Sequence, residues 1–251
     1  MLTPYKDSDE PKVDQIRKMF NRIAPQYDRL NRIISLGLDR SWRRRALHLL
    51  EPYQPQQVLD VATGTGDLAI DLIHTIPSVK HVTGIDISEE MMRIGQEKVQ
   101  ALALERKISF ERQDSTATTF ADASFDAATI GFGIRNFTDI PAAARELHRI
   151  LRPSGVLVII ELSEPKNPIL HLGYKLYAGH IIPLIGRFMS RDRDAYRYLP
   201  KSIAVMPQRE KMVEILKEAG FREAFYRSIF PGSCTIYIGI NAEGSTPDAS
   251  A

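Results

Sequence analysis

Residues that could bind a nucleoside follow four strand-like runs of this sequence, each at the point where the apolar run ends. They are, in chain order, Gly64, Thr65 and Gly66, then Asp86, then Asp114, and then Gly131. Glycine lets the backbone approach a ligand closely, and a carboxylate at the second strand end can accept hydrogen bonds from both ribose hydroxyls. Because ligands bind at the carboxyl ends of parallel strands, this order of residues predicts a nucleoside pocket.

Neighbouring positions refine this pocket. Asp114, followed by Ser115, can meet the exocyclic amine and the ring edge of adenine, and Ile87, directly after Asp86, belongs to the same predicted site. Asp60 lies inside the first strand-like run, where its carboxylate can either order the glycine loop or approach a cationic ligand. The sequence leaves both roles of Asp60 open.

The same spacing also satisfies a loose dinucleotide fingerprint, because a G-x-G-x-x-A run that ends at Ala69 precedes Asp86. Asp60 and Asp67 place negative charge around that loop, which would repel a pyrophosphate. S-adenosylmethionine carries a positive sulfonium and no phosphate, and it fits such a loop better. An NAD-dependent oxidoreductase is the alternative from another class of enzyme.

The elements that must position these residues alternate along the chain. Apolar runs predict strands over residues 58–62, 81–87, 108–112, 125–130, 156–162, 221–229 and 235–240. Apolar periodicity predicts helices over residues 13–23, 40–50, 89–103, 140–151 and 208–219, and one that begins after Gly66. The pattern predicts an α/β fold: a Rossmann-like, seven-stranded, mostly parallel sheet with helices on both faces.

Three local signals set the boundaries of these elements. Pro25 is expected to end the first helix, and residues 152–155 are expected to form a turn. Residues 230–233 are the whole connection between the last two strands, which permits only an antiparallel hairpin. The terminal strand of the sheet is therefore expected to run antiparallel.

We expect a single domain over residues 11–240, with residues 11–52 as a helical lid and residues 165–207 as a helical insert for substrate. The first ten residues are expected to be flexible and residues 241–251 disordered, because both are polar. The insert is aromatic, basic and apolar in patches and shows no strand pattern.

Composition excludes several classes of protein. The net charge of +2, from 33 basic and 31 acidic residues, gives no support for nucleic-acid binding. Cys234 is the single cysteine, so an intramolecular disulfide is excluded and a reducing cytoplasm is expected. We expect no secretory signal, no transmembrane helix and no metal site, because the sequence lacks the corresponding apolar runs and ligand spacings.

Ordered motifs of the chain resemble those of class I methyltransferases, beginning with the run VLDVATGTGDLAI at 58–70. Residues 19–28 and 36–43 resemble the N-terminal signature of the ubiquinone/menaquinone biosynthesis C-methyltransferase family. The run GFGIRN at 131–136 and the run ELSEP at 161–165 resemble further motifs of that family. The resemblance covers residues 13–240.

This resemblance implies S-adenosylmethionine as cofactor, bound by Thr65, Asp86, Asp114 and Ser115, with Gly131 as a weaker candidate. It implies C-methylation of a polyprenylated hydroquinone, converting demethylmenaquinol to menaquinol. A ubiquinone-pathway or dual-specificity quinol methyltransferase is the alternative within the family.

The resemblance also suggests catalytic roles. Arg135 and Asn136 are placed to meet a ring oxygen, and Arg135 is expected to stabilise the oxyanion that activates the ring carbon. Arginine is a poor base, so the proton acceptor is left open between a water molecule and a carboxylate. A structural ion pair is the alternative role for Arg135, and Tyr27 is expected to cover the cofactor as part of the lid.

The apolar residues at 169–189 could supply a path for the prenyl tail, although ordinary core packing or a homodimer interface would produce the same pattern. Basic residues lie beside apolar ones in the insert and in the run 43–45. That combination predicts a cytoplasmic protein with transient contact to the anionic inner face of the membrane.

Overall fold

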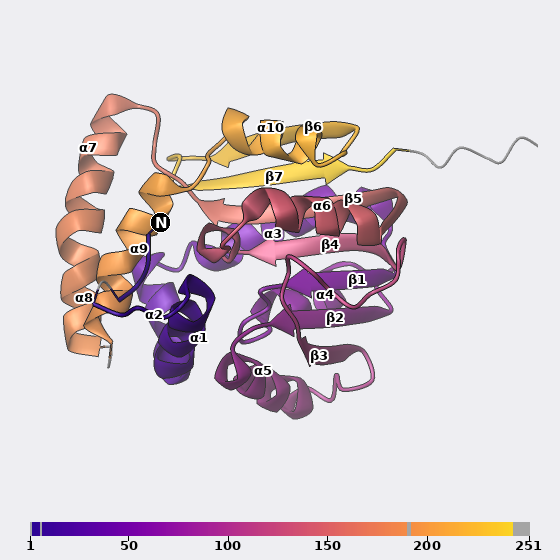
Figure 1. The fold of residues 1–251 in the computed structure, drawn as a ribbon, viewed down its shortest axis with the longest axis horizontal. Helices are drawn as coiled ribbons and strands as arrows, with labels where there is room; N and C mark the ends of the chain where they lie inside the picture. Colours follow the sequence, from indigo (N-terminus) through magenta and orange to yellow (C-terminus); the bar gives the residue numbers. More distant parts are fainter. Residues whose placement is uncertain (1, 6, 190–191, 243–251) are drawn as a thin grey trace, which may run out of the picture.

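The computed structural model describes residues 2–5, 7–189 and 192–242. Their strands form one seven-stranded sheet in the order β3-β2-β1-β4-β5-β7-β6 (Figure 1). The strands are β1 Gln57–Val61, β2 His81–Asp86, β3 Ile108–Arg112, β4 Phe125–Gly131, β5 Leu151–Leu162, β6 Glu223–Ile229 and β7 Cys234–Ile240. Strands β1 to β5 pair in parallel, and β7 runs antiparallel to both β5 and β6. The predicted sheet and its antiparallel terminal strand are confirmed.

Helices cover both faces of this sheet. Helices α3 (Asp39–Leu50), α4 (Asp67–Thr75) and α5 (Glu89–Ala101) pack on one face, and α6 (Ile140–Ile150) and α10 (Glu210–Glu218) pack on the other. Each helix turns one apolar stripe toward the sheet. The sheet is therefore the middle layer, and its central strands β1, β4 and β5 are mostly buried.

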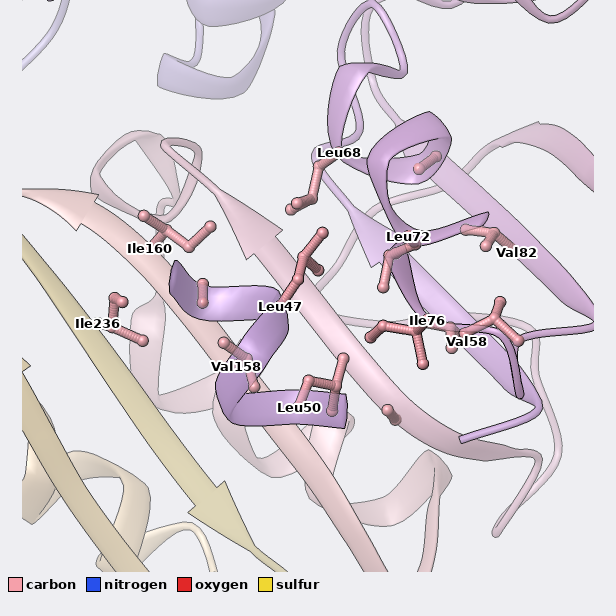
Figure 2. Close-up of a cluster of buried hydrophobic side chains, with 14 of the residues drawn as sticks. Leu47, Leu50, Val58, Leu68, Leu72, Ile76, Val82, Val158, Ile160 and Ile236 are labelled. Atoms are coloured by element: carbon pink, nitrogen blue, oxygen red, sulfur yellow. The ribbon is translucent and has the colours of Figure 1, made fainter. Parts of the chain in front are cut away.

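Figure 2 shows the first of these two cores, where Leu47 and Leu50 of α3 and Leu72 of α4 lie over the sheet. All three side chains are at most 1% exposed. Burial of a leucine side chain stabilises the fold by about 1.5–3 kcal/mol. This packing holds α4 and the glycine loop before it in a fixed position over β1.

A third group of helices caps the edge at which the parallel strands end (Figure 1). It combines α1 (Lys12–Ile23) and α2 (Tyr27–Ile34) with α7 (Pro168–Leu176), α8 (Ile182–Met189) and α9 (Arg193–Val205). One hydrophobic cluster joins the two sets of helices. The N-terminal segment and the insert, about 150 residues apart in sequence, thus form a common wall over the strand ends.

Two local features differ from the sequence prediction. The first helix ends before Pro25 as predicted, since α1 stops at Ile23, but a short 3₁₀ turn (Ala24–Gln26) and helix α2, which were not predicted, follow at once. Residues 152–155 do not form a separate turn but belong to β5. Phe125 pairs with Leu151 and Ala127 with Val156, so these four residues bulge out of the ladder between the two pairs.

The remaining sequence expectations concern the two ends of the chain and its relation to a membrane. The predicted disordered tail lies outside the described residues from residue 243 onward. At the other end, Tyr5 donates its N–H to the side-chain oxygen of Gln15 at 3.0 Å. Within the described ranges, no helix has the length and apolar character needed to cross a bilayer.

Candidate active site

Two cavities meet at the carboxyl ends of the parallel strands. The large cavity has a volume of about 300 Å³, and the small cavity has a volume of about 80 Å³. Seven residues line both: Phe20, Tyr27, Ala62, Gly64, Gly131, Phe132 and Asn136. The shared wall means that a ligand in one cavity can lie directly against a ligand in the other.

The small cavity is built around the end of β2. The two carboxylate oxygens of Asp86 accept hydrogen bonds from the N–H of Gly64 at 2.9 Å and from the N–H of Ser88 at 2.8 Å. Burial raises the pKa of Asp86, although these backbone donors oppose the shift. Each oxygen keeps a further lone pair for a ligand, which suits a pair of vicinal hydroxyls.

Three more predicted residues line the small cavity, namely Ile87, Asp114 and Ser115. The exposed Asp114 carboxylate uses one oxygen to accept hydrogen bonds from the N–H and the hydroxyl of Thr116, at 2.8 and 2.7 Å. These contacts fix the orientation of the carboxylate beside Asp86. The structure thus brings together the two acidic strand ends that the sequence predicted to bind one ligand.

The glycine loop connects the cavities to α4. Gly64 and Gly131 line both cavities, as a close backbone approach requires. Gly66 lines neither cavity; it lies just before α4 with φ +74°, and a Cβ there would approach the Phe110 ring to 3.0 Å. Gly66 therefore shapes the loop, whereas its neighbour Thr65 lines the large cavity.

Asp60 orders the glycine loop, and its approach to a cationic ligand stays a prediction. Its buried carboxylate accepts hydrogen bonds from the hydroxyls of Thr63 at 2.6 Å and Thr129 at 2.7 Å, which orders the loop. Asp60 also lines the large cavity. Burial raises the pKa of Asp60 to about 6, and the two hydroxyl donors oppose that shift. A carboxylate of this kind is sensitive to a cationic ligand.

Arg135 lies at the floor of the large cavity and forms a buried ion pair with Glu161. Its Nη1 donates to Glu161 Oε1 at 2.7 Å and also to the carbonyl of Phe132, while its backbone N–H donates to Glu161 Oε2 at 3.2 Å. Burial disfavours the charged guanidinium, but the Glu161 carboxylate outweighs it, so the pKa of Arg135 is raised. The group stays cationic and is rigidly held.

Asn136 and Tyr27 lie on the wall that the two cavities share. Asn136 is buried, and it ends a 3₁₀ turn (Ile134–Asn136) that follows β4. The ring of Tyr27 packs edge-on against that of Phe20, with 6.0 Å between the ring centres. The residues predicted to contact the reacting atoms are thus placed between the two ligand spaces.

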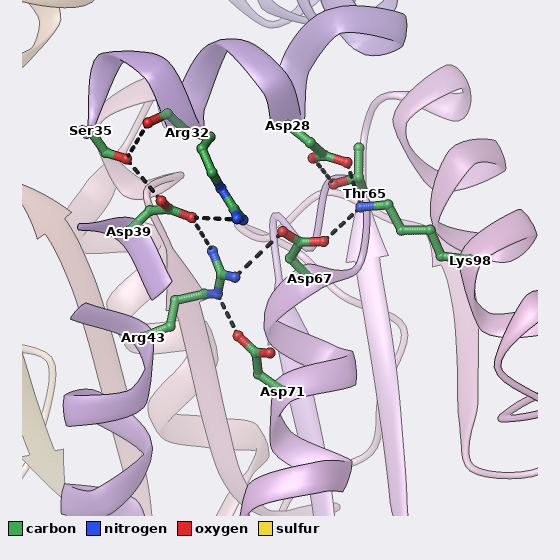
Figure 3. Close-up of polar contacts among 9 residues, drawn as sticks. All are labelled: Asp28, Arg32, Ser35, Asp39, Arg43, Thr65, Asp67, Asp71 and Lys98. Carbon is green, nitrogen blue, oxygen red and sulfur yellow. Dashed lines mark hydrogen bonds and ion pairs between the residues drawn. The ribbon is translucent and has the colours of Figure 1, made fainter. Parts of the chain in front are cut away.

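Helix α2 is bonded directly to the glycine loop (Figure 3). The hydroxyl of Thr65 donates to the Asp28 carboxylate at 2.6 Å. Lys98 of α5 lies 2.5 Å from Asp28 and 2.6 Å from Asp67, the first residue of α4. We call Asp28, Thr65, Asp67 and Lys98 the loop latch.

Arg43 of α3 extends this latch, as Figure 3 shows. It lies 3.5 Å from Asp67, 2.6 Å from Asp71 and 3.1 Å from Asp39. Arg43 is only 8% exposed, so it does not face outward with Arg44 and the rest of the predicted basic run. The sequence prediction of a basic surface at this position is corrected by these carboxylate partners.

Tyr174 and Tyr177, which belong to the run 169–189 predicted as a path for the prenyl tail, line the large cavity together with Tyr198. The sequence prediction missed Tyr198, whose spacing does not mark it, and the role of Glu161. Glu161 had a visible signal, because it is a carboxylate within an otherwise apolar strand. A buried charge of that kind needs a partner.

Comparison with known proteins agrees with this geometry. A model of the ubiE/COQ5 methyltransferase family matches residues 6–241. The demethylmenaquinone methyltransferase of Porphyromonas gingivalis is 51% identical over 239 residues, which cover 95% of this chain and 97% of that protein. The demethylmenaquinone methyltransferase of Bacteroides fragilis is 45% identical over 236 residues, covering 94% and 96%.

Solved structures share the fold at much lower identity. The cyclase SpnF has a TM-score of 0.66 at 16% identity, covering 93% of this chain and 97% of that one. A SAM-dependent methyltransferase from Thermotoga maritima, described as a possible histamine N-methyltransferase, has a TM-score of 0.62 at 18% identity, covering 89% and 99%. Likeness at this level establishes the fold, which serves more than one chemistry.

Proposed function

This chain belongs to the ubiE/COQ5 methyltransferase family, and from that membership we propose that it methylates a ring carbon of demethylmenaquinol to give menaquinol, with S-adenosylmethionine as the methyl donor. The observation that carries the proposal is the set of lining residues shared by two adjacent cavities, of which the small one contains the carboxylates of Asp86 and Asp114 and the large one is lined by Arg135 and by residues of the insert. A methyl donor in the small cavity and a prenylated ring in the large one would meet at Tyr27 and Asn136.

Residues of both cavities suit S-adenosylmethionine, since Asp86 and Asp114 line the small cavity and Asp60 lines the large one. Asp86 and Asp114 offer carboxylate oxygens to a ribose and an adenine, and Asp60 offers negative charge to an ammonium or a sulfonium. The acidic groups around the glycine loop, including Asp67, would repel a pyrophosphate. This favours the methyl donor over the dinucleotide that a loose fingerprint allowed.

When bound, S-adenosylmethionine supplies an electrophilic methyl group, and S-adenosylhomocysteine remains after transfer. Arg135 favours the phenolate form of the hydroxyl next to the reacting carbon, because a fixed cation in a dry cavity stabilises developing negative charge. Asn136 and Tyr27 hold the ring and the donor in line at the shared wall. The phenolate directs electron density onto the carbon that forms the new bond.

The proton from that hydroxyl passes to water in this proposal. Arg135 cannot act as a base, and both oxygens of Glu161 already accept hydrogen bonds, from Arg135 and from the N–H of Leu162. After transfer, the ring carbon loses its hydrogen as a proton and the phenolic oxygen regains one. One proton is released for each methyl group transferred.

A turnover assay tests the proposed function. The purified protein is mixed with labelled S-adenosylmethionine and either reduced demethylmenaquinone or a reduced, unmethylated precursor of ubiquinone. Label in the naphthoquinol alone is the expected result. Label in both rings would mean dual specificity, and label in neither, with the cofactor still bound, would refute the proposed substrate.

The affinity for S-adenosylmethionine is expected to rise about tenfold between about pH 5 and pH 7. A cationic ligand favours the ionised form of Asp60, whose pKa in the free protein is about 6, so binding releases a proton and is weaker below that pH. Calorimetric titration at several pH values measures this slope. An Asp60→Asn variant is expected to show a flat profile, and an unchanged slope in that variant would exclude Asp60 as its source.

The insert also supports the proposed contact with a membrane. Five exposed apolar residues follow one another at intervals of 3, 4, 5 and 3 residues along α7, a π-helical turn (Tyr177–Ile181) and α8. The π-turn absorbs the longer interval and keeps them on one face. We call them the apolar stripe: Ile169, Leu172, Leu176, Ile181 and Leu184.

The charge of this segment favours an anionic lipid surface as the partner of the apolar stripe. Residues 165–191 contain no acidic residue, and Lys166 and Lys175 are exposed. Leu36, which is 75% exposed, also lines the large cavity and so lies at an opening of it. A prenyl tail that leaves the cavity beside Leu36 would enter lipid directly.

Paired Leu172→Asp and Leu176→Asp substitutions are expected to weaken binding to phosphatidylglycerol vesicles at least about tenfold, because each leucine loses its apolar burial in the lipid. Vesicle co-sedimentation at low salt measures the effect. Leu102→Asp, an exposed leucine outside the stripe, is the matched control. A dimer in sedimentation that the paired substitutions abolish would instead assign the stripe to a homodimer interface.

A further inference from the structure

Three residues that line the large cavity each carry a buried polar atom without a hydrogen-bond partner among the described residues. These atoms are Nε of Arg135, Oδ1 of Asn136 and the hydroxyl of Tyr174. The four other such atoms in the described chain belong to residues that do not line this cavity. Buried polar groups in folded proteins are nearly always paired, so a concentration of unpaired ones around a single cavity indicates a polar ligand.

These groups reach the cavity from two different elements. Arg135 and Asn136 belong to the turn after β4, and Asn136 also borders the small cavity. Tyr174 belongs to α7 of the insert and borders only the large cavity. A bound ring would therefore have one polar contact near the methyl donor and another farther from it.

The hydroxyl of Tyr174 stays protonated at neutral pH. Burial raises the pKa of Tyr174, the carboxylate of Glu164 adds to the shift, and the Arg135 guanidinium opposes it. The group can therefore donate a hydrogen bond to an oxygen of a ligand or accept one from it. By contrast, the hydroxyl of Tyr177, in the same wall, already donates to the carbonyl of Ile34 at 2.9 Å.

We propose that Tyr174 is the binding residue for the second hydroxyl of the quinol, the one next to the prenyl-bearing carbon. Arg135 and Asn136 then bind the hydroxyl next to the carbon that is methylated. The assignment follows from the tail, which extends along the insert and places the prenyl-bearing side of the ring beside α7. The inference rests on the proposed function and names how the ring is oriented within it.

The test compares two substrates in two proteins. One substrate is demethylmenaquinol with a short prenyl chain, and the other is the analogue that lacks only the hydroxyl next to the prenyl-bearing carbon. Preference is the ratio of kcat/KM for the quinol to kcat/KM for the analogue. This ratio is expected to be about tenfold higher in the wild-type protein than in the Tyr174→Phe variant. Comparing the two proteins cancels the difference in intrinsic reactivity between the two rings.

A stability measurement and a matched variant separate binding from structure. Tyr174→Phe is expected to leave Tm unchanged, because the hydroxyl that it removes has no partner in the free protein. Tyr237→Phe, at a buried tyrosine that lines neither cavity, removes the hydrogen bond that its hydroxyl accepts from the N–H of Arg209 at 2.9 Å, so it is expected to lower Tm while it keeps the wild-type preference for the quinol.

Three results would overturn the inference. If Tyr174→Phe keeps the wild-type preference for the quinol, the inference fails and the proposed function stands. The same holds if Tyr237→Phe loses that preference to the same extent as Tyr174→Phe. Failure of the wild-type protein to methylate either ring overturns the proposed function and this inference together.

Discussion

Replacing Arg135 with methionine and Glu161 with glutamine in the same protein is expected to lower methyl transfer at least about 100-fold while the protein still folds and binds S-adenosylhomocysteine. The ion pair is buried, with Glu161 fully inaccessible. Removing both charges avoids an unpaired one, so the loss isolates the contribution of the guanidinium to the phenolate. Turnover with demethylmenaquinol and calorimetric binding of S-adenosylhomocysteine measure the two properties.

The single variant Glu161→Gln provides the contrast. It leaves the Arg135 guanidinium buried without its carboxylate, and breaking a buried pair in this way costs about 3–5 kcal/mol of stability. Its Tm should therefore fall well below that of the double variant. If the double variant kept wild-type turnover, the ion pair would be structural and the catalytic role of Arg135 would be excluded.

Asp86→Asn is expected to weaken binding of S-adenosylhomocysteine at least about 100-fold. The carboxylate accepts two backbone hydrogen bonds and, in the proposed complex, two from ribose. An amide offers one oxygen in place of two and removes the charge that strengthens each bond. Isothermal titration calorimetry measures the dissociation constant directly.

Glu89→Gln is the matched control for Asp86→Asn. Glu89 lies three residues away, is exposed and pairs with Arg112 at 2.9 Å, so its loss is expected to leave the dissociation constant unchanged. Normal affinity in Asp86→Asn would remove Asp86 from the cofactor pocket. An equal loss in both variants would indicate a general charge effect.

Local patterns were sufficient to predict the sheet and the small cavity. Apolar runs, the glycine loop and the acidic strand ends are short-range features, and Asp86 and Asp114 lie where the topology of parallel strands requires. Helix α2 was not predicted, because a proline such as Pro25 normally interrupts a helix. In the structure, a 3₁₀ turn accommodates Pro25 and the chain continues into α2. The bulge of β5 arises from pairing with β4, which the sequence of β5 does not encode alone.

The sequence predicted that the insert would receive the substrate, but it did not predict which residues line the large cavity, because the walls of that cavity come from segments that are remote in sequence. Tyr174 faces a wall formed with Tyr27, almost 150 residues earlier in the chain. The contact between Asp28 and Thr65, which are 37 positions apart, could not be predicted either, because each residue has an ordinary local role by itself. Only the packing of the insert against the N-terminal helices reveals which polar groups lack partners.

The loop latch couples the local opening of α2 to the local opening of the glycine loop. Asp28 and Lys98 fasten α2 and α5 to the loop that carries Thr65. If these contacts break together, the amides of residues 64–66 and of α2 will share one rate of hydrogen exchange. A ligand that binds to the loop would then slow hydrogen exchange in α2 by the same factor, including at those α2 residues that line neither cavity.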